Sequence, residues 1–311
     1  MNNKYIANAL TNLIPINNDI VIIKSFKGST RIKGAGMFNI VQDMISHFNE
    51  PTLLDDVVSK LSKKYSEHSL RRLFAMLVDK DVLIREQDYE ILNRHEPAYL
   101  DKFLLYKPEE MDEIINELKS KRIGIVGMSQ LTSQLLVEFA KSNLLFNFDI
   151  PTANENFSQS IIENSDFIIA SGDFYDHIFF NEINKLCIKM NKSWLRIAVD
   201  GSFAEIGPLF IPKETCCYAC LQTRGHQNMS NEELAIDSFY SSQAYRDNKI
   251  NSITTNSLAS IIACAETVKF LSKRVCNIKE HIIMIDSNDF QTQTHYIYKD
   301  YQCPVCVKEV F

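Results

Sequence analysis

The stretch "GPLFIPKETCCYAC", residues 207–220, ends in two cysteines separated by two residues, and "CPVC" at residues 303–306 repeats that spacing. Two C-x-x-C pairs can supply four thiolates for a tetrahedral zinc ion, because a two-residue spacer lets one tight turn present both sulfurs. We therefore predict zinc ligands at Cys217, Cys220, Cys303 and Cys306. Four sulfur ligands leave no open position for water, so the expected ion is structural.

Other interpretations of the cysteines stay open at this point. Cys216 is an alternative to Cys217, at the cost of a three-residue spacer. The pairs could also be redox-active dithiols or plain buried cysteines. Cys187 and Cys264 fall on the faces of expected helices and are interpreted as core, whereas Cys276 has no assignment.

Composition bounds the class of protein. The chain has 311 residues, of which 45% are hydrophobic and 23% charged, as in an ordinary globular protein with more than one domain. It has no apolar run long enough for a membrane helix, and its N-terminus lacks a signal-peptide pattern, so we expect a cytoplasmic protein without a membrane partner. The net charge of −6 gives no general attraction for nucleic acid.

From residue 121 onward, apolar strands alternate with helices. "RIGIV" (122–126), "DFIIAS" (166–171) and "WLRIAV" (194–199) are the clearest strands. This rhythm predicts an α/β fold with a doubly wound, mainly parallel sheet over residues 121–311, and "SFAEIGPLFIP" (202–212) is expected to add an antiparallel strand. The polar residues 224–252 are interpreted as a mobile crossover.

The N-terminal part has a different order of elements. Two strands are expected within residues 20–33, joined at Lys27 and Gly28, followed by three short helices and a closing strand in "DVLIRE" (81–86). Ser66 or Ser69 can cap the third helix. Residues 1–88 therefore predict a small winged-helix-like α+β domain, and residues 89–120 a linker that contains a surface helix.

The stretch "RIGIVGMSQLTSQLL", residues 122–136, has the form of a nucleotide-binding strand-turn-helix. Such a site needs glycines where the backbone approaches phosphate, and free N–H groups at the helix start. After Gly127 the next five residues all carry side chains. A tight complex with a nucleotide is therefore not expected here.

The runs "DFIIASGDF" (166–174) and "NEINKLCIKMNKSWLRIAVDGSFAEIGPLFIPKETCCYACLQTR" (181–224) resemble the core of ThiF-like proteins, the fold of ubiquitin-activating-type adenylating enzymes. The resemblance covers about residues 120–311 and implies that the second C-x-x-C pair completes the family's zinc site. It also implies that Asp173 matches the turn aspartate that helps hold metal and nucleotide; a helix cap is the alternative role. Since the glycine-rich turn is reduced to Gly127, the resemblance implies a degenerate nucleotide site and no ATP use by this chain.

A narrower resemblance is to the ThiF-like partner proteins of azoline-forming cyclodehydratases, which act in the biosynthesis of ribosomal peptides of the thiopeptide or microcin type. It implies a recognition element for a precursor's leader peptide, ahead of a ThiF-like domain that is not itself catalytic. A separate YcaO-type cyclodehydratase would use ATP to form thiazolines and oxazolines from Cys, Ser and Thr. A flavin-dependent azoline dehydrogenase is a further candidate partner, and a homodimer is implied.

In this interpretation the leader peptide adds a strand to a sheet edge, and a groove beside a helix takes its side chains. The expected edge runs from Ser29 to Lys33, and the third helix is the expected groove wall. The proposed contacts are Ser29, Thr30, Arg31, Ile32, Lys33, Leu70, Arg71 and Phe74. The alternative for Leu73, Phe74 and Leu77 is the core of the domain itself.

Two other functions remain as alternatives. An active adenylating enzyme could modify a peptide or the C-terminus of a carrier protein, but it would need phosphate-binding groups that residues 127–132 do not offer. A winged-helix regulator could bind DNA through Arg71 and Arg72, but most of that helix face is apolar and the net charge is unfavourable.

Overall fold

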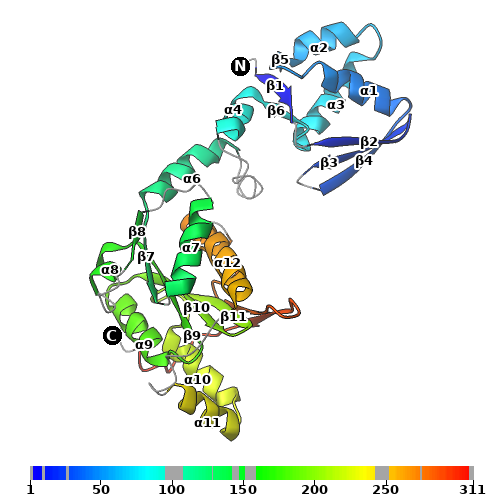
Figure 1. Ribbon diagram of the computed structural model, residues 1–311. Helices are drawn as coiled ribbons and strands as arrows, with labels where there is room; N and C mark the ends of the chain where they lie inside the picture. Colours follow the sequence, from blue (N-terminus) through cyan, green and yellow to red (C-terminus); the bar gives the residue numbers. More distant parts are fainter. Residues whose placement is uncertain are drawn as a thin grey trace. The chain divides into compact units, whose positions relative to one another are not determined.

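The computed structural model describes residues 3–8, 11–25, 28–94, 108–127, 129–141, 147–150, 159–241, 252–273 and 275–307. The chain divides into two compact units, Met1–Glu113 (unit 1) and Ile114–Phe311 (unit 2), which are described separately (Figure 1). Helix α6 (Pro108–Ser120) contains the division and is the helix expected in the linker. Lys27, Met128, residues 95–107 of the expected linker and residues 242–251 of the expected crossover lie outside the described residues.

Unit 1 contains two small antiparallel sheets, with strand orders β5-β1-β6 and β2-β3-β4. Their strands are β1 (Lys4–Ala7), β2 (Asn12–Asn17), β3 (Ile20–Ser25), β4 (Gly28–Lys33), β5 (Thr52–Leu53) and β6 (Leu83–Arg85). The expected pair of strands is confirmed in β3 and β4, and the expected closing strand in β6. Strands β1, β2 and β5 were not expected, because β1 and β5 are short and β2 is exposed along most of its length.

Four helices complete unit 1: α1 (Met37–Ser46), α2 (Leu54–Leu61), α3 (Glu67–Asp79) and α4 (Glu86–Arg94). Apolar side chains of β3, α1, α2 and α3 form one buried cluster, and Val21, Met44 and Leu77 have no exposed surface. Helix α3 begins after Ser66, whose hydroxyl oxygen accepts a hydrogen bond from the Ser69 N–H at 3.2 Å. Ser66 is therefore the cap of this helix.

Unit 2 is built on a seven-stranded sheet with the order β13-β12-β11-β10-β9-β7-β8. Its strands are β7 (Arg122–Gly127), β8 (Asn147–Asp149), β9 (Phe167–Asp173), β10 (Ser193–Asp200), β11 (Phe203–Phe210), β12 (His281–Asp286) and β13 (Thr292–Tyr296). Strands β7 to β10 pair in parallel, and the interiors of β7, β9 and β10 are almost wholly buried, as a sheet with helices on both faces requires. The expected antiparallel addition is confirmed, because β11 pairs antiparallel with β10.

Helices cover both faces of this sheet. They are α7 (Ser129–Lys141), α8 (Gln159–Asn164), α9 (His177–Lys189), α10 (Tyr218–Asn228), α11 (Asn231–Tyr240) and α12 (Ile253–Leu271). Helices α7 and α12 pack together on one face, and α8, α9 and α10 cover the other (Figure 1). Within the described residues, no helix combines the length and the apolar character that crossing a membrane requires.

The polar stretch at residues 224–252 differs from the expected mobile crossover. Residues 224–241 form the end of α10 and the whole of α11. Helix α11 begins with a capping box, in which the Ser230 hydroxyl accepts the Glu233 N–H and the Glu233 carboxylate accepts the Ser230 N–H. The S-x-x-E pattern at residues 230–233 is the sequence signal for this helix, and it explains why a polar stretch is ordered here.

Candidate functional site

The four predicted cysteines lie together in unit 2. Cys217 is at the N-cap of α10 and Cys220 is in its first turn, whereas Cys303 and Cys306 lie in a turn after β13. The sulfur of Cys217 is 3.8 Å from that of Cys220 and 3.7 Å from that of Cys303, and the sulfurs of Cys220 and Cys306 are 3.6 Å apart. The sequence pairs, 86 residues apart, thus form one cluster of four buried thiols.

This geometry fits zinc. A tetrahedral ion with Zn–S bonds of about 2.3 Å requires its sulfurs to lie about 3.8 Å apart, which is close to the separations between these thiols. Cys216 is buried but is not part of the cluster, so the structure favours Cys217 over Cys216 as the ligand. A zinc ion held by these four residues would be closed to water and would fasten the segment after β13 to the start of α10.

The thiols need a cation to ionise together. The pKa of Cys217 is raised mainly by a hydrogen bond with Cys220 and, as the next largest cause, by burial. Burial raises the pKa of Cys306 to about 12, with a further contribution from the charge of Cys220. Four thiolates at these distances would repel one another, and a divalent ion supplies the positive charge that holds them deprotonated.

The turn after β7 is packed, not open. Gly127 has φ +117°, and a Cβ built on it would lie 1.8 Å from the carbonyl oxygen of Ser171 in β9. The glycine is therefore required by the close approach of two strands, whether or not a phosphate binds here. At the start of α7, Leu131 has no exposed surface and Thr132 is buried, so these side chains fill the core at the position of the family's missing glycines.

Asp173 is the last residue of β9 and pairs with Val199 of β10. Helix α9 begins only at His177, and its N-cap residue is Asp176, so Asp173 does not cap this helix. The backbone of Asp173 thus ends a parallel strand at the same edge of the sheet as Gly127. The side chain of Asp173 lies outside the described part of the chain.

The expected peptide edge corresponds to β4, which has β3 as its only neighbour in the described part of unit 1. Ser25 pairs with Gly28 and Val21 pairs with Ile32 in this ladder. Two positions beyond Val21 and Ile32, the Gly34 N–H donates a hydrogen bond to the Asp19 carbonyl at 2.9 Å, which marks the hydrogen-bonded pairs of the ladder. Because hydrogen-bonded pairs alternate in an antiparallel ladder, Ser29, Arg31 and Lys33 direct their N–H and C=O groups away from β3. Their side chains are exposed, whereas Ile32 is buried and Thr30 is half-buried.

The expected contacts on the third helix are placed differently. Leu70 has no exposed surface and Phe74 is buried, and both belong to the core of unit 1 together with Leu73 and Leu77. The side chain of Arg71 is partly exposed and pairs with Asp55 at 2.8 Å and with Glu67 at 2.9 Å. The edge strand is thus accessible, whereas Leu70 and Phe74 serve the domain's own core.

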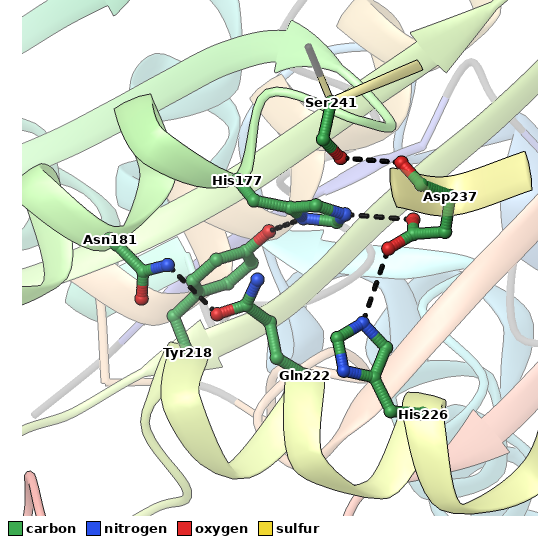
Figure 2. Close-up of polar contacts among 7 residues, drawn as sticks. All are labelled: His177, Asn181, Tyr218, Gln222, His226, Asp237 and Ser241. Carbon is green, nitrogen blue, oxygen red and sulfur yellow. Dashed lines mark hydrogen bonds and ion pairs between the residues drawn. The ribbon is translucent and has the colours of Figure 1, made fainter. Parts of the chain in front are cut away.

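A polar cluster in unit 2 was not predicted. The carboxylate of Asp237 on α11 lies 2.8 Å from His177 Nε2 and 3.2 Å from His226 Nε2, and the Tyr218 hydroxyl lies 2.8 Å from His177 Nδ1 (Figure 2). These residues come from α9, α10 and α11 and are up to 60 residues apart in the chain. No spacing motif in the sequence relates them, so only the fold brings them together.

The fold and the cysteine cluster define the class of protein. The strand-helix rhythm predicted the mainly parallel sheet and its antiparallel extension, and the ThiF-like resemblance implied that the two C-x-x-C pairs meet, as they do in the cluster of four cysteines. A sequence comparison matches residues 129–305 to the ThiF family. The chain therefore belongs to the ThiF family.

Solved structures share this fold at low sequence identity. The heterocyclase TruD matches 99% of this chain with 17% identity and a TM-score of 0.68, and this chain spans 43% of the TruD chain. E. coli MccB, solved with succinimide, matches 97% of this chain and 99% of its own, with 15% identity and a TM-score of 0.69. The structure of MccB solved with ATP matches 97% of this chain and 99% of its own, with 15% identity and a TM-score of 0.67. A search of curated proteins gave no match.

Proposed function

We propose that this chain is a leader-peptide-binding scaffold subunit in the biosynthesis of ribosomal peptides with thiazole or oxazole rings. Residues 1–88 bind the leader of a precursor peptide, residues 89–120 link the two parts, and residues 121–311 form a ThiF-like scaffold that does not use ATP itself. A YcaO-type cyclodehydratase receives the peptide and converts Cys, Ser or Thr into thiazolines or oxazolines. A flavin-dependent azoline dehydrogenase acts later, and the chain assembles as a homodimer.

The observation that carries this proposal is the free edge of β4. Ser29, Arg31 and Lys33 offer unpaired backbone groups to a strand that adds in the plane of the sheet, which is how extended peptides are recognised by β-augmentation. The similarity to the heterocyclase TruD over nearly the whole of this chain supports the same class of function. The side chains at the turn after Gly127 support a scaffold without its own nucleotide.

The opposite edge of the sheet is less suited to a peptide. Strand β2 contains Pro15, which has no N–H to donate, and its register with β3 shifts between Pro15 and Asn17. Proline and irregular register are two ways in which proteins block the edge of a sheet. Strand β4 has neither feature, so we assign the leader to β4.

A proline at position 31 tests the β4 edge. Arg31→Pro removes one outward N–H and places a ring where the added strand would lie, but it leaves the ladder to β3 intact. We expect the affinity for the leader to fall by about tenfold or more. The measurement is fluorescence polarisation of the full chain with a labelled synthetic leader peptide of a candidate precursor.

Arg31→Ala is the matched control, because it removes the same side chain and keeps the backbone N–H. The alanine variant should retain affinity within about fivefold, since an exposed charge contributes little. Thermal denaturation of both variants checks that unit 1 still folds. Equal affinities of the proline variant and the wild type would refute the assignment of the leader to the β4 edge. Equal losses of affinity in the proline and alanine variants would refute it as well.

An ATP-using enzyme that modifies a peptide is the second candidate function. The observation that favours it is the match to E. coli MccB, which covers 99% of the MccB chain and includes a structure solved with ATP. In this alternative the turn at Gly127 would have to hold phosphate groups despite the buried Leu131 and Thr132. Binding of Mg-ATP separates the two candidates.

A further inference from the structure

The cluster of His177, His226 and Asp237 has the donor set of a metal site. Two imidazole nitrogens and one carboxylate oxygen lie within 4.8 Å of one another. In Figure 2 the two rings approach Asp237 from different sides, and His177 is on α9 whereas His226 is on α10. Three protein ligands of these types are typical of zinc sites that keep a fourth position for an exchangeable ligand.

The distances are close to those that zinc requires. Bonds of about 2.0 to 2.1 Å to nitrogen and oxygen place neighbouring tetrahedral ligands about 3.3 Å apart. The carboxylate of Asp237 lies 2.8 Å from His177 Nε2 and 3.2 Å from His226 Nε2. The side chains would have to open by about half an ångström to admit an ion, which is within the range of small rotations about their χ angles.

The surroundings of His177 support the same role. A histidine that binds metal through one ring nitrogen usually donates a hydrogen bond from the other, which fixes the orientation of the ring. The second nitrogen, Nδ1, lies 2.8 Å from the hydroxyl of Tyr218, a side chain that is almost completely buried. The side of the ring that faces Asp237 is therefore held in place independently of any ion.

The Asp237 carboxylate has no permanently charged side chain as a partner among the described residues. Its side chain is 11% exposed, and in the described part of the chain its ion-pair partners are the two histidines, with no lysine or arginine among them. A buried carboxylate is stabilised by a cation, which either a charged imidazole or a metal ion would supply.

The fourth coordination position of such an ion would face a pocket of about 210 Å³, which the three residues line. His177, His226 and Asp237 line it together with Gln222, Arg196 and Glu205. Arg196 is buried and pairs with Glu205 at 2.6 Å, yet its Nε has no hydrogen-bond partner. The pocket thus combines the cluster with the ion pair of Arg196 and Glu205 and with Gln222, and a few convergent polar groups of this kind are typical of a site for a small polar ligand.

From these observations we propose that His177, His226 and Asp237 bind a zinc ion with an exchangeable fourth position open to this pocket. This ion is separate from the one at the four cysteines, although α10 contributes to both sites. The competing role is a latch of hydrogen bonds that fastens α11 to α9 and α10 without any metal.

Metal content distinguishes the two roles. The full-length chain is equilibrated with Zn²⁺, freed of weakly bound ions, and analysed for zinc per chain. We expect two zinc ions in the wild type, one for each cluster, and loss of one in His226→Ala and in Asp237→Asn. His226 is the preferred position because its side chain is 44% exposed, so the alanine variant should fold. Circular dichroism verifies the fold.

His295→Ala is the matched control, since His295 is an exposed histidine of unit 2 outside both clusters, and this variant should keep two ions. With Co²⁺ in place of Zn²⁺, the thiolate charge-transfer band of the cysteine site should persist in His226→Ala, while absorption from the second ion disappears. One zinc ion in the wild type would overturn the proposal, as would two in His226→Ala or a loss in His295→Ala.

Discussion

Replacing Cys220 with serine is expected to release the zinc ion from the four-cysteine cluster and to unfold much of unit 2. Cys220 contacts both Cys217 and Cys306, so its loss removes one of the four sulfur ligands and one of the two contacts between the C-x-x-C pairs. A structural zinc site can contribute about 10 kcal/mol or more of folding free energy, which is comparable to the whole stability of a domain. Zinc content and thermal denaturation of the full chain measure the effect.

Cys276→Ser is the matched control for that experiment. Cys276 is half-buried and lies outside the cluster, so its variant should keep the zinc and melt close to the wild type. A chelator that strips zinc from the wild type should reproduce the effect of Cys220→Ser. A Cys220→Ser variant that holds as many zinc ions per chain as the Cys276→Ser variant and melts at the same temperature would show that the cysteines do not form a metal centre.

Replacing Gly127 with alanine is expected to destabilise unit 2 by about 3 kcal/mol or more. The new Cβ would lie 1.8 Å from the Ser171 carbonyl oxygen, at a φ of +117° that side chains rarely adopt. Strands β7 and β9 would have to separate to relieve the clash, and both are central to the sheet. Chemical denaturation followed by circular dichroism measures the free energy of unfolding.

Gly225→Ala is the control for the same substitution type. Gly225 is on α10, and a Cβ at this position meets no atom within 4 Å. Alanine in a helix is favoured over glycine by up to about 1 kcal/mol, so this variant should be at least as stable as the wild type. If Gly127→Ala proved as stable as Gly225→Ala, the glycine would not be there for strand packing.

The sequence predicted those parts of the molecule that depend on local patterns. The cluster of four cysteines could be predicted because a two-residue spacer by itself brings two sulfurs close together, and two matching pairs are typical of one shared site. The parallel strands could be predicted because β7 and β10 are buried on both faces and therefore almost continuously apolar, with Arg196 as the exception in β10.

Features that depend on tertiary contacts were missed or assigned differently. His177 and Asp237 are 60 residues apart and meet only because α11 returns to the start of α9. Leu70 and Phe74 are apolar residues of a helix, and their sequence alone does not distinguish a groove wall from a core. The polarity of residues 224–252 concealed α11, because a surface helix is stabilised by its capping box and not by an apolar stripe.

The central claim is that this chain binds a leader peptide as a scaffold and leaves ATP to a partner. Calorimetric titration of the full-length, zinc-loaded chain with Mg-ATP, with and without the precursor peptide, tests it most directly. We predict no heat of nucleotide binding in either case, because the residues after Gly127 carry side chains where a nucleotide site needs glycines, and Leu131 and Thr132 in the first turn of α7 are packed in the core. Tight binding of Mg-ATP, accompanied by formation of an adenylate on the peptide, would contradict the claim and establish the chain as an enzyme in its own right.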